Sequence, residues 1–417
     1  MKSGGLIIKM VMIAFLSYLV IPASAQVDSL GYITVSGVIK NSKTKKELSS
    51  VNIFLPSSHV GTVTNDDGYF NLKLKKMVPE IVISHLGYKS QRIKLERENL
   101  NDLKIMLVPH TNLINEIVVL GLNPAELIEE ALDKVSDNYS KKSTILTGFY
   151  RETAQKGKKF INVSEAVINI FKTPYKESVE SDRVQILKGR RLLSQKASDT
   201  LGVKLMGGPT LCIFADVAKN RDSFLSKGQL QYYNFRMEEG TILDGHQQYV
   251  ISFYPKTELP NDPLFIGKAY IDKDNLAFSR IEFSLDMSDK YKATRAILYR
   301  KPLGLRFNPQ EMSYVVNYKI EDGISYLNYI RNSISFKCDW KKRLFSKGFT
   351  VVSEMVVTDQ DDKNVVSIPR RDSFDRDDAF YDKVANFNND NFWEDYNIIE
   401  PTESLEHAVN KLKKQQK

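Results

Sequence analysis

The residues best suited to chemistry are Tyr150, Arg151 and Glu152, which follow one another, and a second acid, Glu165. Two carboxyl groups beside a guanidinium could act as general acid and base if their separation and pKa values suited a substrate. On a strand, however, Tyr150 and Glu152 face one side and Arg151 faces the other. The favoured interpretation is therefore a cross-strand ion pair between Arg151 and Glu165 or another acid. A hydrolase site is the alternative, and no catalytic residue is assigned.

The remaining motifs predict no cofactor and no metal. Asp66-Asp67-Gly68 fails as a calcium loop because Val63 and Leu74 would occupy its first and twelfth positions, where Asp and Glu are needed. Glycine-rich nucleotide loops and serine nucleophile motifs are missing from the sequence. The histidines are too scattered for a zinc pattern, as the spacing of three of them shows: His59, His85 and His110.

The first 25 residues predict export. Lys2 and Lys9 precede an apolar run from Met10 to Ile21, which ends before the small residues Ala23 to Ala25. This order is typical of a cleaved secretory signal peptide, and the run is shorter than the ~20 residues that cross a bilayer as a helix. Gln26 would begin the mature chain, with no cysteine beside it for a lipid anchor. We expect a protein of the periplasm or one associated with the outer membrane.

Length and charge limit the classes of protein. The chain has 417 residues, 42% of them hydrophobic, which favours two or three domains with their own cores. Its 59 basic and 51 acidic side chains give a net charge of +8, and the two signs are interspersed. A basic stripe with interleaved aromatics is missing, so no nucleic-acid partner is expected.

Two cysteines, Cys212 and Cys338, leave two alternatives open. Export to an oxidising compartment would allow a disulfide between them. Cys212 lies in the apolar run Leu211 to Phe214, which favours a buried free thiol instead.

Residues 32–120 show short alternating runs separated by turns, which predicts a small antiparallel β-sandwich. The clearest turn is Asn65 to Gly68, because the Asp-Gly pair supplies the positive φ of a tight hairpin. Strands are expected on both sides of it, at Thr62 to Thr64 and at Tyr69 to Leu74.

These runs resemble a known family, the carboxypeptidase-regulatory-like domain. The residues that carry the resemblance are Val35-Ser36-Gly37-Val38-Ile39, Val51-Asn52-Ile53, Gly61 to Phe70 and His85-Leu86-Gly87-Tyr88. The resemblance implies a transthyretin-like (Ig-like) sandwich of the kind found at the N-termini of many exported Bacteroidota proteins and TonB-dependent receptors. It implies a non-catalytic interaction or stability module and no peptidase.

Residues 123–358 predict a second, larger β domain. Asn123 and Pro124 open an amphipathic helix that ends near Tyr139. Strands joined by short polar turns then favour one long, curled antiparallel meander, whose apolar face the helix would cover. The expected strands include 247–254, 266–271, 276–285, 293–299, 312–320, 325–336 and 349–357.

This second region also resembles a β-rich region of exported Bacteroidota proteins for which no activity is implied. The residues are Asn138-Tyr139, Gly148 to Glu152, Ser164-Glu165-Ala166, Gly207-Gly208-Pro209 and Asn391 to Pro401. Gly267 to Asp272 additionally resembles the strand and turn of lipoprotein-carrier (LolA-like) half-barrels.

The C-terminal part divides into two expected segments. Residues 359–391 are very polar and predict a loop or mobile linker. Residues 392–417 hold Phe392, Trp393 and Tyr396, followed by an amphipathic helix. Aromatics in a polar tail usually clamp a segment onto its domain, and a partner-binding patch is the alternative.

Together these patterns favour a non-catalytic binding or scaffolding protein of the cell envelope, whose curved sheet holds an apolar ligand such as a lipid or a protein partner. Peripheral membrane association is compatible with this. The alternatives are a hydrolase of envelope polymers and an accessory component of a TonB-dependent uptake system. The residues singled out for binding are Tyr150, Arg151, Glu152, Glu165, Trp393 and Tyr396.

Overall fold

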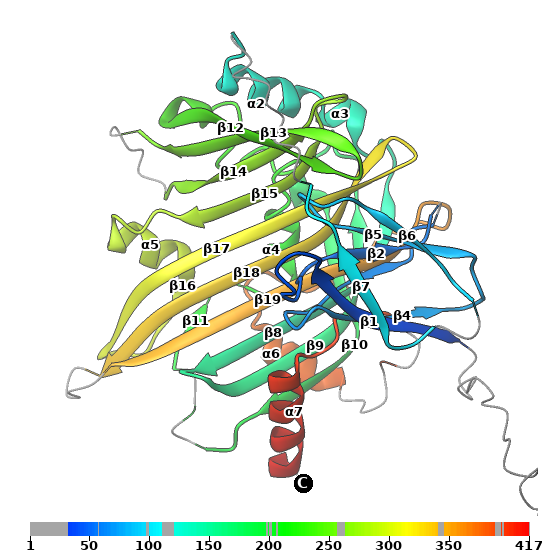
Figure 1. Ribbon diagram of the computed structural model, residues 1–417. Helices are drawn as coiled ribbons and strands as arrows, with labels where there is room; N and C mark the ends of the chain where they lie inside the picture. The colour runs from blue at the N-terminus through cyan, green and yellow to red at the C-terminus, as the bar shows by residue number, and fades with distance from the viewer. Residues whose placement is uncertain are drawn as a thin grey trace, which may run out of the picture.

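The computed structural model describes residues 32–416, apart from 57, 97–99, 111–120, 197–198, 200–201, 206, 257–262, 341–345, 388–392 and 394–395. The expected signal peptide and Phe392 lie outside the described residues. Two β units make up most of the fold, and the smaller one lies in front of the larger in Figure 1. Among the helices of the described residues, none has the length and apolar content needed to cross a lipid bilayer.

The N-terminal unit is a β-sandwich with its own core. One sheet has the order β4-β1-β7 and the other β3-β2-β5-β6. The strands are β1 (Ile33–Asn41), β2 (Asn52–Phe54), β3 (Gly61–Val63), β4 (Tyr69–Leu74), β5 (Glu80–Ser84), β6 (Gln91–Lys94) and β7 (Leu103–Leu107). Inward-facing aliphatic residues and Phe70 fill the space between the sheets. The expected sandwich is confirmed, although β1 and β7 pair in parallel.

The turn from Asn65 to Gly68 differs from the expected hairpin. Gly68 has a φ of 71°, as predicted, and Asn65 Oδ1 accepts hydrogen bonds from the backbone of Asp67 and Tyr69. The strands on its two sides nevertheless belong to different sheets, since β4 pairs with β1 and β3 with β2. The hairpin prediction was wrong because the turn carries the chain across the sandwich.

The larger unit is built on a ten-stranded sheet in the order β10-β9-β8-β19-β18-β17-β15-β14-β13-β12, with all pairs antiparallel. Its strands are β8 (Thr144–Lys156), β9 (Lys159–Lys172), β10 (Arg183–Leu193), β12 (Tyr233–Leu243), β13 (His246–Pro255), β14 (Phe265–Asp272), β15 (Phe278–Leu285), β17 (Leu305–Glu321), β18 (Ile324–Trp340) and β19 (Lys347–Asp361).

A single meander, as expected from the sequence, does not describe this sheet. The chain enters it in the middle at β8, runs to the edge at β10, and crosses to the opposite edge at β12. It then returns strand by strand until β19 pairs with β8. The crossover, residues 194–232, contains β11 (Lys204–Leu205), α4 (Pro209–Phe214) and a 3-10 turn (Leu230–Tyr232). A two-residue strand, β11, pairs with β16 (Leu298–Arg300).

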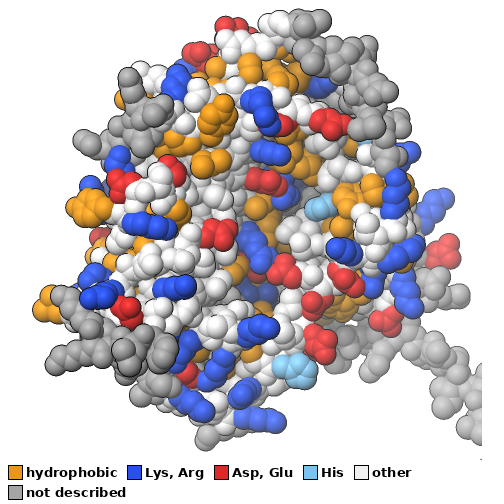
Figure 2. All heavy atoms as spheres, turned by 60° about the vertical axis from the view of Figure 1, so that its left-hand side comes forward, with side chains coloured by type: hydrophobic (Ala, Val, Ile, Leu, Met, Phe, Trp, Pro, Cys, Tyr) orange, Lys and Arg blue, Asp and Glu red, His pale blue; other side chains and the backbone are white. Residues whose placement is uncertain are grey.

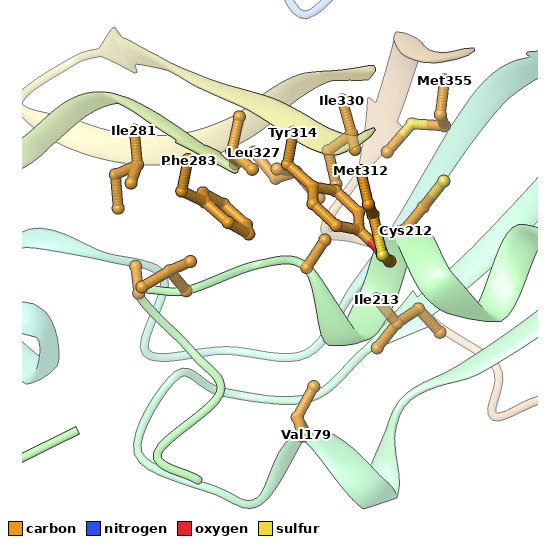
Figure 3. Packing of buried hydrophobic residues seen from close by; sticks show 14 of the residues in the cluster. Val179, Cys212, Ile213, Ile281, Phe283, Met312, Tyr314, Leu327, Ile330 and Met355 are labelled. Carbon is orange, nitrogen blue, oxygen red and sulfur yellow. The ribbon is translucent and has the colours of Figure 1, made fainter. Parts of the chain in front are cut away.

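The two faces of the large sheet have different covers. The core face carries Tyr150 and Phe283 and packs against α4 and the crossover. Figure 3 shows Met312 and Tyr314 of β17 pointing towards Cys212 and Ile213 of α4. The opposite face, which we call the sandwich face, packs in part against the N-terminal sandwich.

The predicted helix at Asn123 is present as α2 (Pro124–Asp133), with Asn123 Oδ1 accepting from the backbone of Ala125. It buries Leu127 and Ile128 in the core, but a break at Lys134 separates it from α3 (Val135–Asn138).

The strand expected at 293–299 is wrong. The segment forms α5 (Lys290–Ile297), because Asp289 caps two backbone N–H groups and Ala293 and Ile297 are buried one helical turn apart.

The C-terminal part packs against the large unit at several points. The segment expected as a loop or mobile linker includes α6 (Phe380–Lys383) and 3-10 turns at Arg370–Asp372 and Val384–Phe387. Its residues Phe374, Phe380 and Val384 are buried in the core, so from Phe374 onwards the segment is a packed loop, which was one of the two expected alternatives. The predicted final helix is α7 (Glu403–Gln416), which packs Leu405 and Val409 against β9 and β10 (Figure 1).

Candidate functional site

The predicted ion pair lies on the sandwich face of three neighbouring strands. Glu165 of β9 is opposite Arg151 of β8 on one side and Arg190 of β10 on the other. Arg151 Nε lies 2.7 Å from Glu165 Oε1, and Arg190 Nε lies 2.6 Å from Oε2. All three side chains are buried. The cross-strand interpretation is confirmed, and Arg190 is a partner that the sequence did not reveal.

The C-terminal segment covers this cluster. Arg151 also donates to the backbone oxygen of Ile399 at 2.7 Å. Trp393 packs edge-on against Phe149 with ring centroids 5.2 Å apart, and the guanidinium of Arg190 lies 5.2 Å from the Trp393 ring. Tyr396 has a similar contact with the ammonium of a lysine, Lys188. These contacts are those of a clamp between chain segments, which was the favoured interpretation of the tail aromatics.

Glu152 lies on the opposite face of the sheet from Glu165. Glu152 pairs with Ser164, whereas Glu165 pairs with Arg151, and successive pairs along two strands face opposite sides. Burial raises the pKa of Glu152 to about 7, although Tyr150 donates a hydrogen bond to its carboxyl group. Burial acts in the same direction on Glu165, but the two arginines outweigh it and hold its pKa below the usual range. The carboxyl groups of Glu152 and Glu165 therefore differ in pKa. Because the sheet separates them, they cannot act on one bond, and the alternative of a hydrolase site formed by these two acids is wrong.

A buried charge network on the core side was not predicted. Lys172 Nζ lies 2.6 Å from Asp216 and 3.3 Å from Asp182, while Lys219 Nζ lies 2.6 Å from Asp182. Tyr318 donates to Asp216 at 2.8 Å. Because each charge is paired and buried, the network fastens the crossover to β9 and β17. Its members are far apart in the sequence and follow no motif.

An apolar pocket of about 340 Å³ lies between the crossover and the core face. Phe224 of the crossover contacts Phe265 and Phe283 with centroid distances of 4.8 and 4.6 Å, and Phe283 stacks on Tyr314 at 4.8 Å. Ser223 contributes a buried hydroxyl that has no hydrogen-bond partner among the described residues. The other lining residues include Ala215, Val217, Asn220, Asp222, Gln229 and Leu264.

Cys212 and Cys338 are both buried free thiols, so the disulfide alternative is not formed. Cys212 belongs to α4 and Cys338 to β18. Burial raises the pKa of both thiols, that of Cys338 to about 11, which disfavours the reactive thiolate.

The N-terminal sandwich is similar to a known domain family. A family model described as the CarboxypepD_reg-like domain matches residues 35–119. This part of the chain is a CarboxypepD_reg-like domain. The chain is also similar to the TonB-dependent receptor SusC of Bacteroides thetaiotaomicron, with 30% identity over 122 residues. That match covers 29% of this chain and 11% of the receptor, so the chain spans about a tenth of the length of this relative.

Solved structures with some likeness to the chain have low scores. A DUF1329 family protein from Desulfovibrio piger has 12% identity and a TM-score of 0.26, over 59% of this chain and 96% of its own. A putative outer membrane lipoprotein-sorting protein domain from Vibrio parahaemolyticus has 12% identity and a TM-score of 0.24, over 63% and 97%. A LolA superfamily protein from Nitrosomonas europaea has 10% identity and a TM-score of 0.22, over 57% and 94%. The mainly β fold class is confirmed by the sheets themselves, whereas the half-barrel resemblance stays a prediction.

Proposed function

We propose that this protein is an exported, non-catalytic binding protein of the cell envelope that holds a small apolar ligand against its large sheet. The observation that carries this proposal is the aromatic pocket under the crossover. Its volume of about 340 Å³ falls at the lower end of the range of roughly 300–1,000 Å³ that is usual for small-molecule sites. Apolar walls with a few polar groups are the usual composition of such sites.

The walls of the pocket are fixed before a ligand arrives. Asp216 lies between the lining residues Ala215 and Val217, and both Asp216 and Lys219 are tied to the sheet by the buried charge network. The opposite wall consists of β14, β15 and β17, whose strands are paired on both sides. A preformed pocket loses little conformational entropy on binding, which favours affinity for a small ligand.

The envelope location is supported by the N-terminal domain and by the predicted signal peptide. The similarity to a TonB-dependent receptor favours a second candidate function, an accessory component of a TonB-dependent uptake system with a protein partner. The two candidates are compatible, because the pocket and the sandwich lie on opposite faces of the large sheet.

The pocket can be tested with a fluorescent apolar probe, N-phenyl-1-naphthylamine, whose emission rises in an apolar site. We expect saturable binding by the wild-type chain. Ser223→Trp should abolish it because the indole would fill the cavity, while Ser288→Trp, in an exposed turn, should leave it unchanged. Equal binding by Ser223→Trp and the wild type would refute the proposed site. Native mass spectrometry of protein purified gently from its own envelope would identify an extracted lipid or a bound polypeptide.

A further inference from the structure

A second cluster, unconnected with the apolar pocket, joins an imidazole and two carboxylates from neighbouring hairpins. His246 begins β13, and Asp272 and Asp274 lie at the turn between β14 and β15. His246 Nδ1 lies 3.0 Å from an oxygen of Asp274 and 3.7 Å from an oxygen of Asp272. We propose that these three residues bind one divalent transition-metal cation of the Zn²⁺ type.

The separations of the donor atoms suit such an ion. Zinc binds histidine nitrogen and carboxylate oxygen at about 2.0–2.2 Å, so donors in a tetrahedral arrangement lie about 3.3 Å apart. One donor atom from each of the three residues falls within 4.8 Å of the other two. Small side-chain rotations therefore suffice, and His246 and Asp274 are exposed enough to make them, at 53% and 74%.

The ion pairs around the cluster also leave room for a cation. Asp272 is only 1% exposed, yet no lysine or arginine of the described residues forms an ion pair with it or with Asp274. Arg280 and Lys319 line the same cavity as Asp272, but they pair with Glu282 and Glu321 instead. The carboxylates of Asp272 and Asp274 are therefore available as ligands of a divalent cation, with His246 as their neighbour.

The buried carboxylate is already held in place by neighbours. Gln248 Nε2 donates to Asp272 Oδ2 at 3.2 Å, and Ser279 donates to the other end of the Gln248 amide at 2.7 Å. The backbone N–H groups of Asp274 and Asn275 donate to Asp272 Oδ1. Oxygen Oδ2 is thus oriented towards the imidazole by a hydrogen-bond chain, as carboxylate ligands of metal sites usually are.

The site opens on the boundary between the two β units. His246 and Asp272 line a cavity of about 140 Å³ that His85 and Leu86 of the sandwich line from the other side. Figure 2 shows the hollow between the large sheet and the sandwich on this side of the molecule. Water can therefore reach the site and complete the coordination, and a bound cation would brace the hairpin that touches the sandwich through Gly87.

Isothermal titration of the chelator-treated full chain with ZnCl₂ tests this proposal. We expect one Zn²⁺ per chain and a rise in the unfolding temperature. His246→Ala and Asp274→Asn should each weaken binding at least tenfold and remove the rise, whereas His407→Ala, an exposed histidine on α7, should change neither. Asp274 is exposed, so Asp274→Asn should fold normally and keep the test decisive. No Zn²⁺ binding by folded wild type, or equal binding by either site variant, would overturn the assignment.

Discussion

Replacing Glu152 by glutamine should stabilise the protein at neutral and alkaline pH. In the folded chain burial raises the pKa of this carboxyl group to about 7, against an ordinary value of 4.5. Above pH 7 the wild type must therefore hold a poorly solvated charge on the core face of its sheet. Glutamine keeps the shape and a carbonyl acceptor for the Tyr150 hydroxyl but carries no charge.

The magnitude follows from the linkage between protonation and folding. A folded-state pKa of about 7 against 4.5 in the unfolded chain corresponds to about 3 kcal/mol at about 1.4 kcal/mol per pKa unit. Glu152 is partly exposed, so solvent screening reduces this to about 2 kcal/mol. Because folding raises the pKa of this acid, the wild type loses stability as pH rises from 4.5 through 7. The advantage of the variant should therefore be near zero at pH 4.5 and complete at pH 8.

Urea denaturation at pH 5, 6, 7 and 8 measures this difference directly. The matched control is Glu165→Gln, the same substitution one register pair away on the other face of the sheet. It should destabilise at every pH in the series, by about 3–5 kcal/mol, because it leaves Arg151 and Arg190 buried without their shared counter-charge. A Glu152→Gln variant that is less stable than the wild type at pH 8, or whose advantage does not depend on pH, would refute the reasoning.

Three further outcomes are expected. Lys219→Met should lower the free energy of unfolding by about 3–5 kcal/mol, because it removes a buried cation from Asp182, and equilibrium denaturation would show it. Trp393→Ala should cost about 2 kcal/mol and increase proteolytic cleavage of the C-terminal segment, since it deletes the packing on Phe149. Burial, with Arg280 nearby, lowers the pKa of His85 to about 4. The free energy of unfolding should therefore fall as pH drops from 6.5 towards 4, and His85→Gln should make it depend less on pH in that range.

The parts of the fold that the sequence predicted depend on local pattern. Alternation separated Arg151 from Glu152, but the pairing of Arg151 with Glu165 also depends on a register shift between Ala154 and Gln155, because the turn at Gly157 pairs Lys156 with Lys159. The sandwich was identified because its turns and strands follow one another in a pattern known from a family. At Asp289 capping outweighs strand propensity, because the capped N-terminus and the buried i, i+4 pair Ala293 and Ile297 define a helix despite the β-branched and aromatic residues nearby.

The contacts that the sequence did not reveal join segments that are far apart along the chain and meet only in the folded sheet. Arg190 reaches Glu165 only after an irregular connection, and Asp182 reaches Lys219 only through the crossover. The crossover itself joins opposite edges of the sheet, and no local signal distinguishes it from another loop of a meander. The His246 cluster has the same origin, since its carboxylates and its imidazole come from separate hairpins that align only in the folded sheet.

The C-terminal segment explains how the two β units keep one orientation. Asn397 exchanges hydrogen bonds with the backbone of Lys73 in the sandwich, and Thr62 donates to the backbone of Ile398. The next residue, Ile399, accepts from Arg151 of the large sheet. The same few residues therefore satisfy polar groups of both units while their side chains fill the apolar boundary between them. Loss of this segment would expose both Arg151 and the apolar boundary between the two units. The orientation of the sandwich therefore depends on the C-terminal segment as much as on the large sheet.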